Sequence, residues 1–145
     1  MKRILHPSDF SAASRPAFKK AIDLAKKDRA TLDLVHVMTP IVPVPGDAYI
    51  SPSTYDEWTT AATEAARKKM DGLLKQARAA GVRATWMIVT GAPAERIVRA
   101  ARTRRADLIV MGTHGRSGLS RFLLGSVASR VIATSPCPVL TVRGK

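Results

Sequence analysis

The sequence predicts an α/β fold in which one open, Rossmann-like parallel sheet carries helices on both faces. The length of 145 residues suits a single domain spanning 1–145. Short apolar segments alternate with amphipathic ones, and strictly alternating strands and helices produce parallel sheets with right-handed crossovers. Leu108-Ile109-Val110-Met111 is a continuous apolar run, which is typical of a strand buried on both faces.

The chain begins with an expected strand and an expected helix. The strand opens at Ile4 and ends at the turn of residues 7–9. Apolar residues then recur at three- and four-residue spacing over 14–28, which predicts a helix. We expect Ser14 as its N-cap and Pro16 in its first turn, where the missing N–H costs little.

A second expected strand, 32–38, leads into a proline-rich loop. Four of the nine prolines lie within 39–53, and neither a helix nor a central strand tolerates so much proline. We expect a long helix to follow, with Thr54 as N-cap, Glu57 completing a capping box and Gly81 ending it. Its expected apolar face comprises Trp58, Ala62, Ala65, Met70, Leu73, Leu74 and Ala77.

The second half continues the alternation. A third strand is expected over 84–89, and Pro93 then opens a third helix at a position that proline favours. The apolar run 108–111 is the fourth strand. A helix over about 125–134 and a last strand from Val139 to Val142 complete the predicted fold.

The charge of the chain is uneven. Twenty-four Lys and Arg minus eleven Asp and Glu give +13, of which residues 1–72 contribute +2 and residues 73–145 contribute +11. A basic excess suits nucleic acid or anionic small molecules, although most of these arginines suit a solvated helix face. The single cysteine excludes an intrachain disulfide, and no apolar run approaches the ~18 residues of a membrane span. We expect a cytoplasmic protein.

The loop after the fourth strand is the main candidate for chemistry. It contains Gly112, Gly115 and Gly125, and glycines let backbone N–H groups surround a phosphate. The helix that starts at Gly125-Ser126 would add its positive dipole end, and Arg116 and Arg121 could add charge. The alternative is a sharp turn without a ligand. Across the sheet, the Asp9 carboxylate could accept hydrogen bonds from a ribose or a base, or only cap a helix.

These residues resemble the universal stress protein family, in the branch that binds ATP. The similarity runs from Ile4-Leu5-His6-Pro7-Ser8-Asp9-Phe10-Ser11 to Ser135-Pro136-Cys137-Pro138-Val139-Leu140-Thr141-Val142. Its most specific part is Gly-x2-Gly-x9-Gly-Ser, here Gly112, Gly115, Gly125 and Ser126.

The resemblance implies a five-stranded sheet of order 3-2-1-4-5 that binds ATP, or AMP or ADP, in a regulatory or stress-response role with at most slow hydrolysis. It also implies a divalent cation, Mg²⁺ or Mn²⁺, held by the phosphates, and a homodimer through Val139 to Val142. The implied nucleotide-binding residues are Pro7, Asp9, Val37, Met111, Gly112, His114, Gly115, Arg116, Gly125, Ser126 and Val127.

The sequence leaves two alternative functions open. A basic nucleic-acid-binding module is disfavoured because Trp58 and Trp86 lie in core patterns instead of among the arginines. An enzyme that transfers phosphate or adenylate is the other alternative, but the Walker pattern G-x4-G-K-[ST] is absent. The three histidines lack metal-ligand spacing, and Cys137 suits a buried apolar position.

Overall fold

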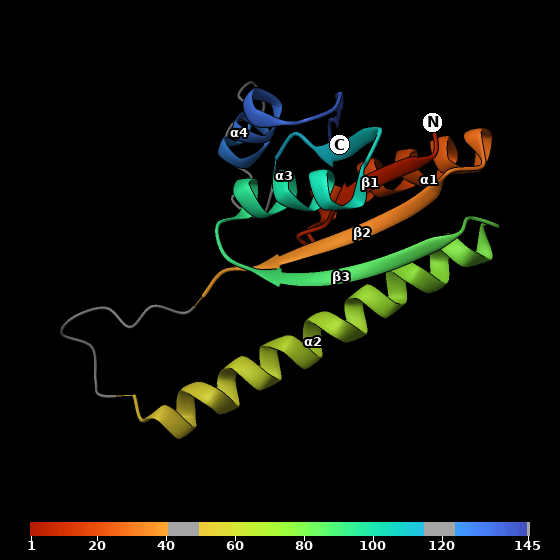
Figure 1. Cartoon of the computed structure of the whole chain (residues 1–145). Helices are drawn as coiled ribbons and strands as arrows, with labels where there is room; N and C mark the ends of the chain where they lie inside the picture. Colours follow the sequence, from red (N-terminus) through yellow and green to blue (C-terminus); the bar gives the residue numbers. More distant parts are fainter. Residues whose placement is uncertain (41–49, 115–123, 145) are drawn as a thin grey trace.

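The computed structural model describes residues 1–40, 50–114 and 124–144. Within these ranges, five strands alternate with four α-helices, and a short 3-10 helix precedes the first of the α-helices (Figure 1). In chain order the elements are β1 (Arg3–Pro7), η1 (Ala12–Ser14), α1 (Arg15–Asp28), β2 (Thr31–Met38), α2 (Pro52–Ala79), β3 (Ala84–Thr90), α3 (Pro93–Arg104), β4 (Leu108–Gly112), α4 (Ser126–Thr134) and β5 (Val139–Val142).

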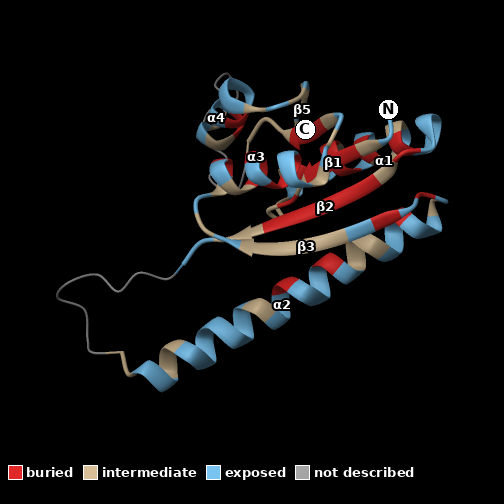
Figure 2. Cartoon of the chain, in the orientation of Figure 1, coloured by how far each residue is buried: buried red, intermediate tan, exposed pale blue. Residues whose placement is uncertain are grey.

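The strands form one parallel sheet of order β3-β2-β1-β4-β5, which confirms the predicted fold class and strand order. Successive residues of a strand point to opposite faces, so Ile4 packs with Phe18 and Met70 of α1 and α2, whereas Leu5 packs with the apolar side of α3 and α4. Figure 2 shows β1 and β2 almost wholly buried. The two helical layers therefore cover opposite faces of the sheet.

Hydrogen bonds to two carboxylates join the strands at the amino end of the sheet. The Asp33 carboxylate is fully buried, and it accepts hydrogen bonds from Thr85 Oγ1 at 2.7 Å and from an Arg3 guanidinium nitrogen at 3.1 Å. Asp107, before β4, accepts the backbone N–H groups of Lys2 at 2.6 Å and Arg3 at 2.9 Å, and these bonds lower the pKa of its carboxyl.

At the opposite end, β1 and β4 diverge. Their register holds only two pairs, Ile4 with Leu108 and Leu5 with Ile109, whereas β1 stays paired with β2 along its whole length. The His6 side chain fills the start of this gap, where its Nδ1 donates to the Val110 carbonyl at 2.8 Å. A parallel sheet whose order reverses between two strands opens a crevice at that point, and this one lies between β1 and β4.

The beginning of α2 differs from the prediction. The N-cap is Ser51, whose Oγ accepts the Thr54 N–H at 3.2 Å, so Thr54 already lies in the first turn and caps nothing. The prediction failed because Pro52 suits the first helical position and extends the helix toward the loop. Ser14 does occupy the N-cap of α1, but its hydroxyl donates to the Ser11 carbonyl instead of capping an N–H.

The expected apolar face of α2 was wrong in its first half. Ala66, Met70 and Ala77 are buried, but Trp58 is 48% exposed. Figures 1 and 2 show why: the first half of α2 extends past the end of the sheet, where no strand lies beneath it. No helix in the described ranges is long and apolar enough to cross a membrane.

Burial of His6 predicts a pH dependence of stability. Burial lowers the pKa of His6 from 6.5 to about 4, although the bond to Val110 and the nearby Asp9 charge favour the protonated ring. Below pH 6.5, His6 of the unfolded chain therefore binds a proton, whereas His6 of the folded chain binds one only below about pH 4. We expect the free energy of unfolding to fall across this window, by about 3 kcal/mol from His6 alone.

Urea unfolding at pH 7 and pH 4.5 measures this loss. The His6→Asn variant keeps an N–H donor for Val110 but does not titrate, so its unfolding free energy should depend less on pH than that of the unmodified chain. Carboxylates contribute equally to both proteins and cancel in the difference. Identical pH dependence of the two proteins would contradict the prediction.

Candidate functional site

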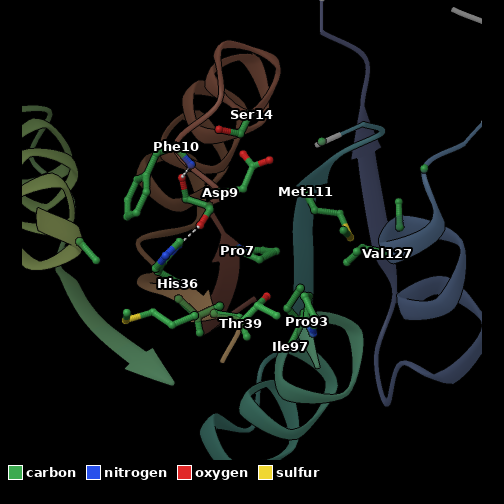
Figure 3. A pocket seen from close by; sticks show the side chains of 18 of the residues that line it. Pro7, Asp9, Phe10, Ser14, His36, Thr39, Pro93, Ile97, Met111 and Val127 are labelled. Atoms are coloured by element: carbon green, nitrogen blue, oxygen red, sulfur yellow. Dashed lines mark hydrogen bonds between the residues drawn. The ribbon is translucent and has the colours of Figure 1, made fainter. Parts of the chain in front are cut away.

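A pocket of about 590 Å³ occupies the carboxyl end of the sheet, at the divergence of β1 and β4. Figure 3 shows Phe10 and His36 on the side of α2, Met111 and Val127 on the side of α4, and Pro7 between them. The ends of β1, β2 and β4 and residues of α2, α3 and α4 all contribute to the lining. Its volume is within the range of ~300–1,000 Å³ that small-molecule sites occupy.

The α4 side of the pocket is built around Gly125. This N-cap residue offers no side chain, and its N–H donates to the Thr113 carbonyl at 2.8 Å. A Cβ on Gly125 would lie 2.9 Å from that carbonyl oxygen, so the close approach of the two segments requires glycine. The first-turn N–H groups of a helix have no intrahelical acceptor. Those of Ser126 and Val127, which line the pocket, are therefore suited to an anion.

Asp9 organises the turn after β1. Its Oδ1 accepts the Ser11 N–H at 3.0 Å and the Ser11 hydroxyl at 2.6 Å, and the Phe10 N–H donates to Ser8 Oγ at 3.2 Å. Phe10 has φ of 64°, a left-handed conformation that is uncommon for a bulky side chain. These bonds hold the strained turn, and the Asp9 carboxylate lines the pocket (Figure 3).

The α2 side of the pocket combines rings with a cation. The Phe10 and His36 rings lie 4.2 Å apart between centroids, and His36 Nδ1 donates to the Ser8 carbonyl at 2.8 Å. The Lys69 ammonium lies 5.3 Å from the centre of the Phe10 ring, at a cation–π distance. The Phe10 conformation thus places a ring between an imidazole and an ammonium group at the edge of the pocket.

Nine of the eleven residues predicted for the site line this one pocket. They are Pro7, Asp9, Val37, Met111, Gly112, His114, Gly125, Ser126 and Val127. Gly115 and Arg116, together with Arg121, lie outside the described residues. The fold therefore brings together residues that are more than one hundred positions apart in the sequence.

Other lining residues were not predicted. Pro93 and Ile97 come from the start of α3, and Phe10, His36 and Lys69 form the α2 side. Phe10 and His36 could have been found, because Phe10 follows the turn after the first predicted strand and His36 lies two positions before the end of the second. Lys69 could not, since its approach to the pocket depends on how α2 crosses the sheet.

His114 is a candidate for acid–base chemistry, and clusters of His, Cys, Asp or Glu would be candidates for holding a metal ion. His114 Nδ1 lies 3.0 Å from Thr113 Oγ1, and its Nε2 is buried without a partner among the described residues. Within those residues, no group of three or more His, Cys, Asp or Glu could hold a metal ion. Cys137 is partly buried, beside Ser135.

The arrangement can bind a molecule that has an anionic end and an apolar ring. The start of α4 supplies N–H groups and a positive dipole end to the anion. The Asp9 carboxylate can accept hydrogen bonds from hydroxyl or amino groups, while Pro7, Val37 and Met111 supply apolar walls.

The comparisons with known proteins agree with this architecture. The Universal stress protein family matches residues 1–143. Universal stress protein MJ0531 of Methanocaldococcus jannaschii is 38% identical over 144 residues, covering 98% of this chain and 82% of the relative. The solved structure of universal stress protein UspA from Lactobacillus plantarum superposes with a TM-score of 0.83 at 27% identity, covering 98% and 97% of the two chains. A universal stress protein in complex with cAMP has a TM-score of 0.70 at 25% identity, with 99% and 98% covered. The chain belongs to the universal stress protein family.

Proposed function

We propose that this chain binds an adenine nucleotide, with ATP as the main ligand and AMP or ADP as related ones, and that it serves a regulatory or stress-response role. The observation that carries the proposal is the pocket between β1 and β4, which has the start of α4, with glycine at its N-cap, on one side and a carboxylate on the other. Together with the apolar walls at Val37 and Met111, this layout matches the phosphates, the sugar and the base of a nucleotide.

Each part of a nucleotide has a complementary surface in the pocket. Phosphates suit the first-turn N–H groups at Ser126 and Val127, which glycine leaves accessible. Ribose hydroxyls suit the Asp9 carboxylate, and the base suits the apolar walls at Val37 and Met111. The related universal stress protein solved with cAMP supports adenine nucleotides as the ligand class.

The same proposal includes a divalent cation, Mg²⁺ or Mn²⁺, which the phosphates would hold, because the described residues offer no cluster of protein ligands. It includes at most slow hydrolysis, since the sequence has no Walker lysine to stabilise charge on a leaving phosphate. A cytoplasmic location suits a chain with a single cysteine.

The structure removes one objection to nucleic-acid binding and supplies another. Trp58 was expected in the core, but it is exposed, so burial does not prevent it from contacting a nucleic acid. However, the exposed part of α2 that carries it also carries Asp56, Glu57 and Glu64 and no basic residue before Arg67. Phosphate repulsion therefore disfavours nucleic acid at this tryptophan.

Substitutions in the two halves of the pocket test nucleotide binding. We expect Gly125→Val combined with Ser126→Ala to abolish ATP binding, because the new side chain would displace Thr113 and close the approach to the helix start. Asp9→Asn retains an oxygen for the Ser11 bonds but loses its charge, so the Kd for ATP should rise about tenfold. Isothermal titration calorimetry measures both effects.

Ser129→Ala is the matched control, since it removes a hydroxyl one turn along α4, on an exposed position outside the pocket. Thermal unfolding should show that each variant is folded. Unchanged ATP affinity in a folded Gly125→Val/Ser126→Ala protein would remove the phosphate assignment, and failure of the unmodified chain to bind any adenine nucleotide would remove the proposal.

We also propose a homodimer through β5. This strand ends the sheet and pairs with β4 alone among the described strands. The Pro138 carbonyl accepts the Ile109 N–H of β4, and the Val142 carbonyl accepts the N–H of Thr113, which follows β4. The alternating residues Val139 and Thr141 therefore direct their backbone groups outward. An open edge of this kind is a template for another strand.

Thr141→Pro tests this dimer, because proline removes the outward N–H without touching the bonds to β4. We expect a folded protein whose dimer dissociates at lower concentration, measured by analytical ultracentrifugation. Thr141→Val is the control, since it retains the N–H and suits a strand. Equal dissociation of the two variants would contradict a dimer that depends on this edge.

A further inference from the structure

The outer face of α2 has no partner within the described part of the chain. The helix packs on β2 and β3 through Ala66, Met70 and Ala77, and the rest of its 28 residues are mostly exposed (Figure 2). At 1.5 Å per residue, α2 is about 42 Å long. It therefore presents a long, solvent-facing surface.

Charge is segregated along this helix. Residues 52–66 contain three acids, Asp56, Glu57 and Glu64, and no base, which gives −3. Residues 67–79 contain five bases and one acid, Asp71, which gives +4. The helix dipole favours acids in the first turn and bases in the last, but Glu64 and Lys68 lie in the middle, where the dipole has no such effect.

The charges gather on the face that points away from the sheet. With 3.6 residues per turn, the side opposite Ala66, Met70 and Ala77 carries the exposed residues Glu57, Ala61, Glu64, Lys68 and Lys75. The ion pairs among the described residues are Met1 with Asp28 and Arg3 with Asp33. Glu64 and Lys68, although four residues apart, form none.

We propose that α2 of one copy packs antiparallel against α2 of a second copy of this chain. A two-fold axis level with Ala66 sets Glu57 of each helix opposite Lys75 of the other, and Glu64 opposite Lys68. Every acid of the outer face thereby meets a base, as a self-complementary two-fold interface requires. Parallel pairing would instead set each charge against itself, which costs free energy.

Trp58 and Gly72 fit the same arrangement. Trp58 flanks the acidic end of this face, is 48% exposed, and is a residue type that dominates interface energies. Gly72 lies inside the helix, where glycine costs about 1 kcal/mol relative to alanine, and a Cβ there would meet nothing within 4 Å in its own chain. In the antiparallel pair, Trp58 of one helix lies about 3 Å along the axis from the level of Gly72 of the other, within reach of an indole, and the glycine leaves room for that ring.

Carbodiimide cross-linking tests the pairing directly, because it joins only carboxylates and amines that are in contact. The unmodified protein is mixed from ¹⁴N- and ¹⁵N-labelled batches, so that mass spectrometry identifies links between chains. We expect mixed-isotope links Glu57–Lys75 and Glu64–Lys68. Their absence at concentrations where the chain self-associates would overturn the proposal, whether or not a β5 dimer exists.

Charge reversal provides the second measurement, by analytical ultracentrifugation in the Thr141→Pro background so that the β5 edge does not contribute. Glu57→Lys/Glu64→Lys and Lys68→Glu/Lys75→Glu should each weaken association roughly tenfold or more. An equimolar mixture of the two, or the chain with all four changes, should regain it. Trp58→Ala should weaken association without changing its charge dependence.

The matched controls reverse equal charge on other helices. Asp23→Lys/Glu95→Lys and Lys19→Glu/Lys26→Glu alter exposed residues of α1 and α3. They should leave association within about twofold of the parent. Equal effects of control and test pairs, or failure of the mixture to regain association, would show that net charge and not α2 pairing is responsible.

Discussion

The separation of β1 from β4 is the constraint on which the rest of this structure depends. The two strands pair over only two residues. The carbonyl of Val110, which a longer pairing could use, instead accepts a hydrogen bond from the buried His6 ring. Because this acceptor is satisfied, the strands can diverge without leaving the Val110 carbonyl unpaired, although the other ring nitrogen, His6 Nε2, is buried with no partner among the described residues. The divergence produces the pocket and brings Asp9 to face Gly112 and Gly125 across it. The cost is a neutral histidine in the core, which makes stability sensitive to acid.

The two ends of the sheet have opposite characters for a physical reason. At the amino end, Asp33 and Asp107 use their oxygens on Arg3, Thr85 and backbone N–H groups, so the strands are held together there. At the carboxyl end, helix starts and strand ends converge, and the first-turn N–H groups and positive dipole ends of the helices favour an anion. The closed end stabilises the register while the open end remains available for a ligand.

Much of this fold could be predicted from the sequence, because alternation and apolar runs are local signals. The approximate strand bounds, the order of elements and the presence of Asp9 and Gly112 at one crevice all followed from pattern or from the family resemblance. What failed depended on contacts between distant segments. Trp58 has the spacing of a core residue, but spacing cannot tell whether a strand lies beneath that turn of the helix. Lys69 reaches the pocket only because α2 crosses the end of β2, and the choice of Ser51 over Thr54 as N-cap depended on how far the helix extends into the loop.

One helix thus contributes to two different surfaces. Ala62, Ala66 and Lys69 of α2 line the pocket, while Glu57, Glu64, Lys68 and Lys75 lie on its outer side. Thr63 contacts the Met38 sulfur at 3.7 Å, which ties the helix to the end of β2 near His36. A ligand that orders the Phe10–Lys69 contact would also order the middle of α2. If the outer face pairs as proposed, linkage requires that any effect of the ligand on pairing be matched by an equal effect of pairing on the ligand. Lys75 is the one paired residue that belongs to the basic second half of the chain, so most of that basic excess does not enter this coupling. The pairing uses charges of residues 57–75, where acids and bases are segregated along the helix.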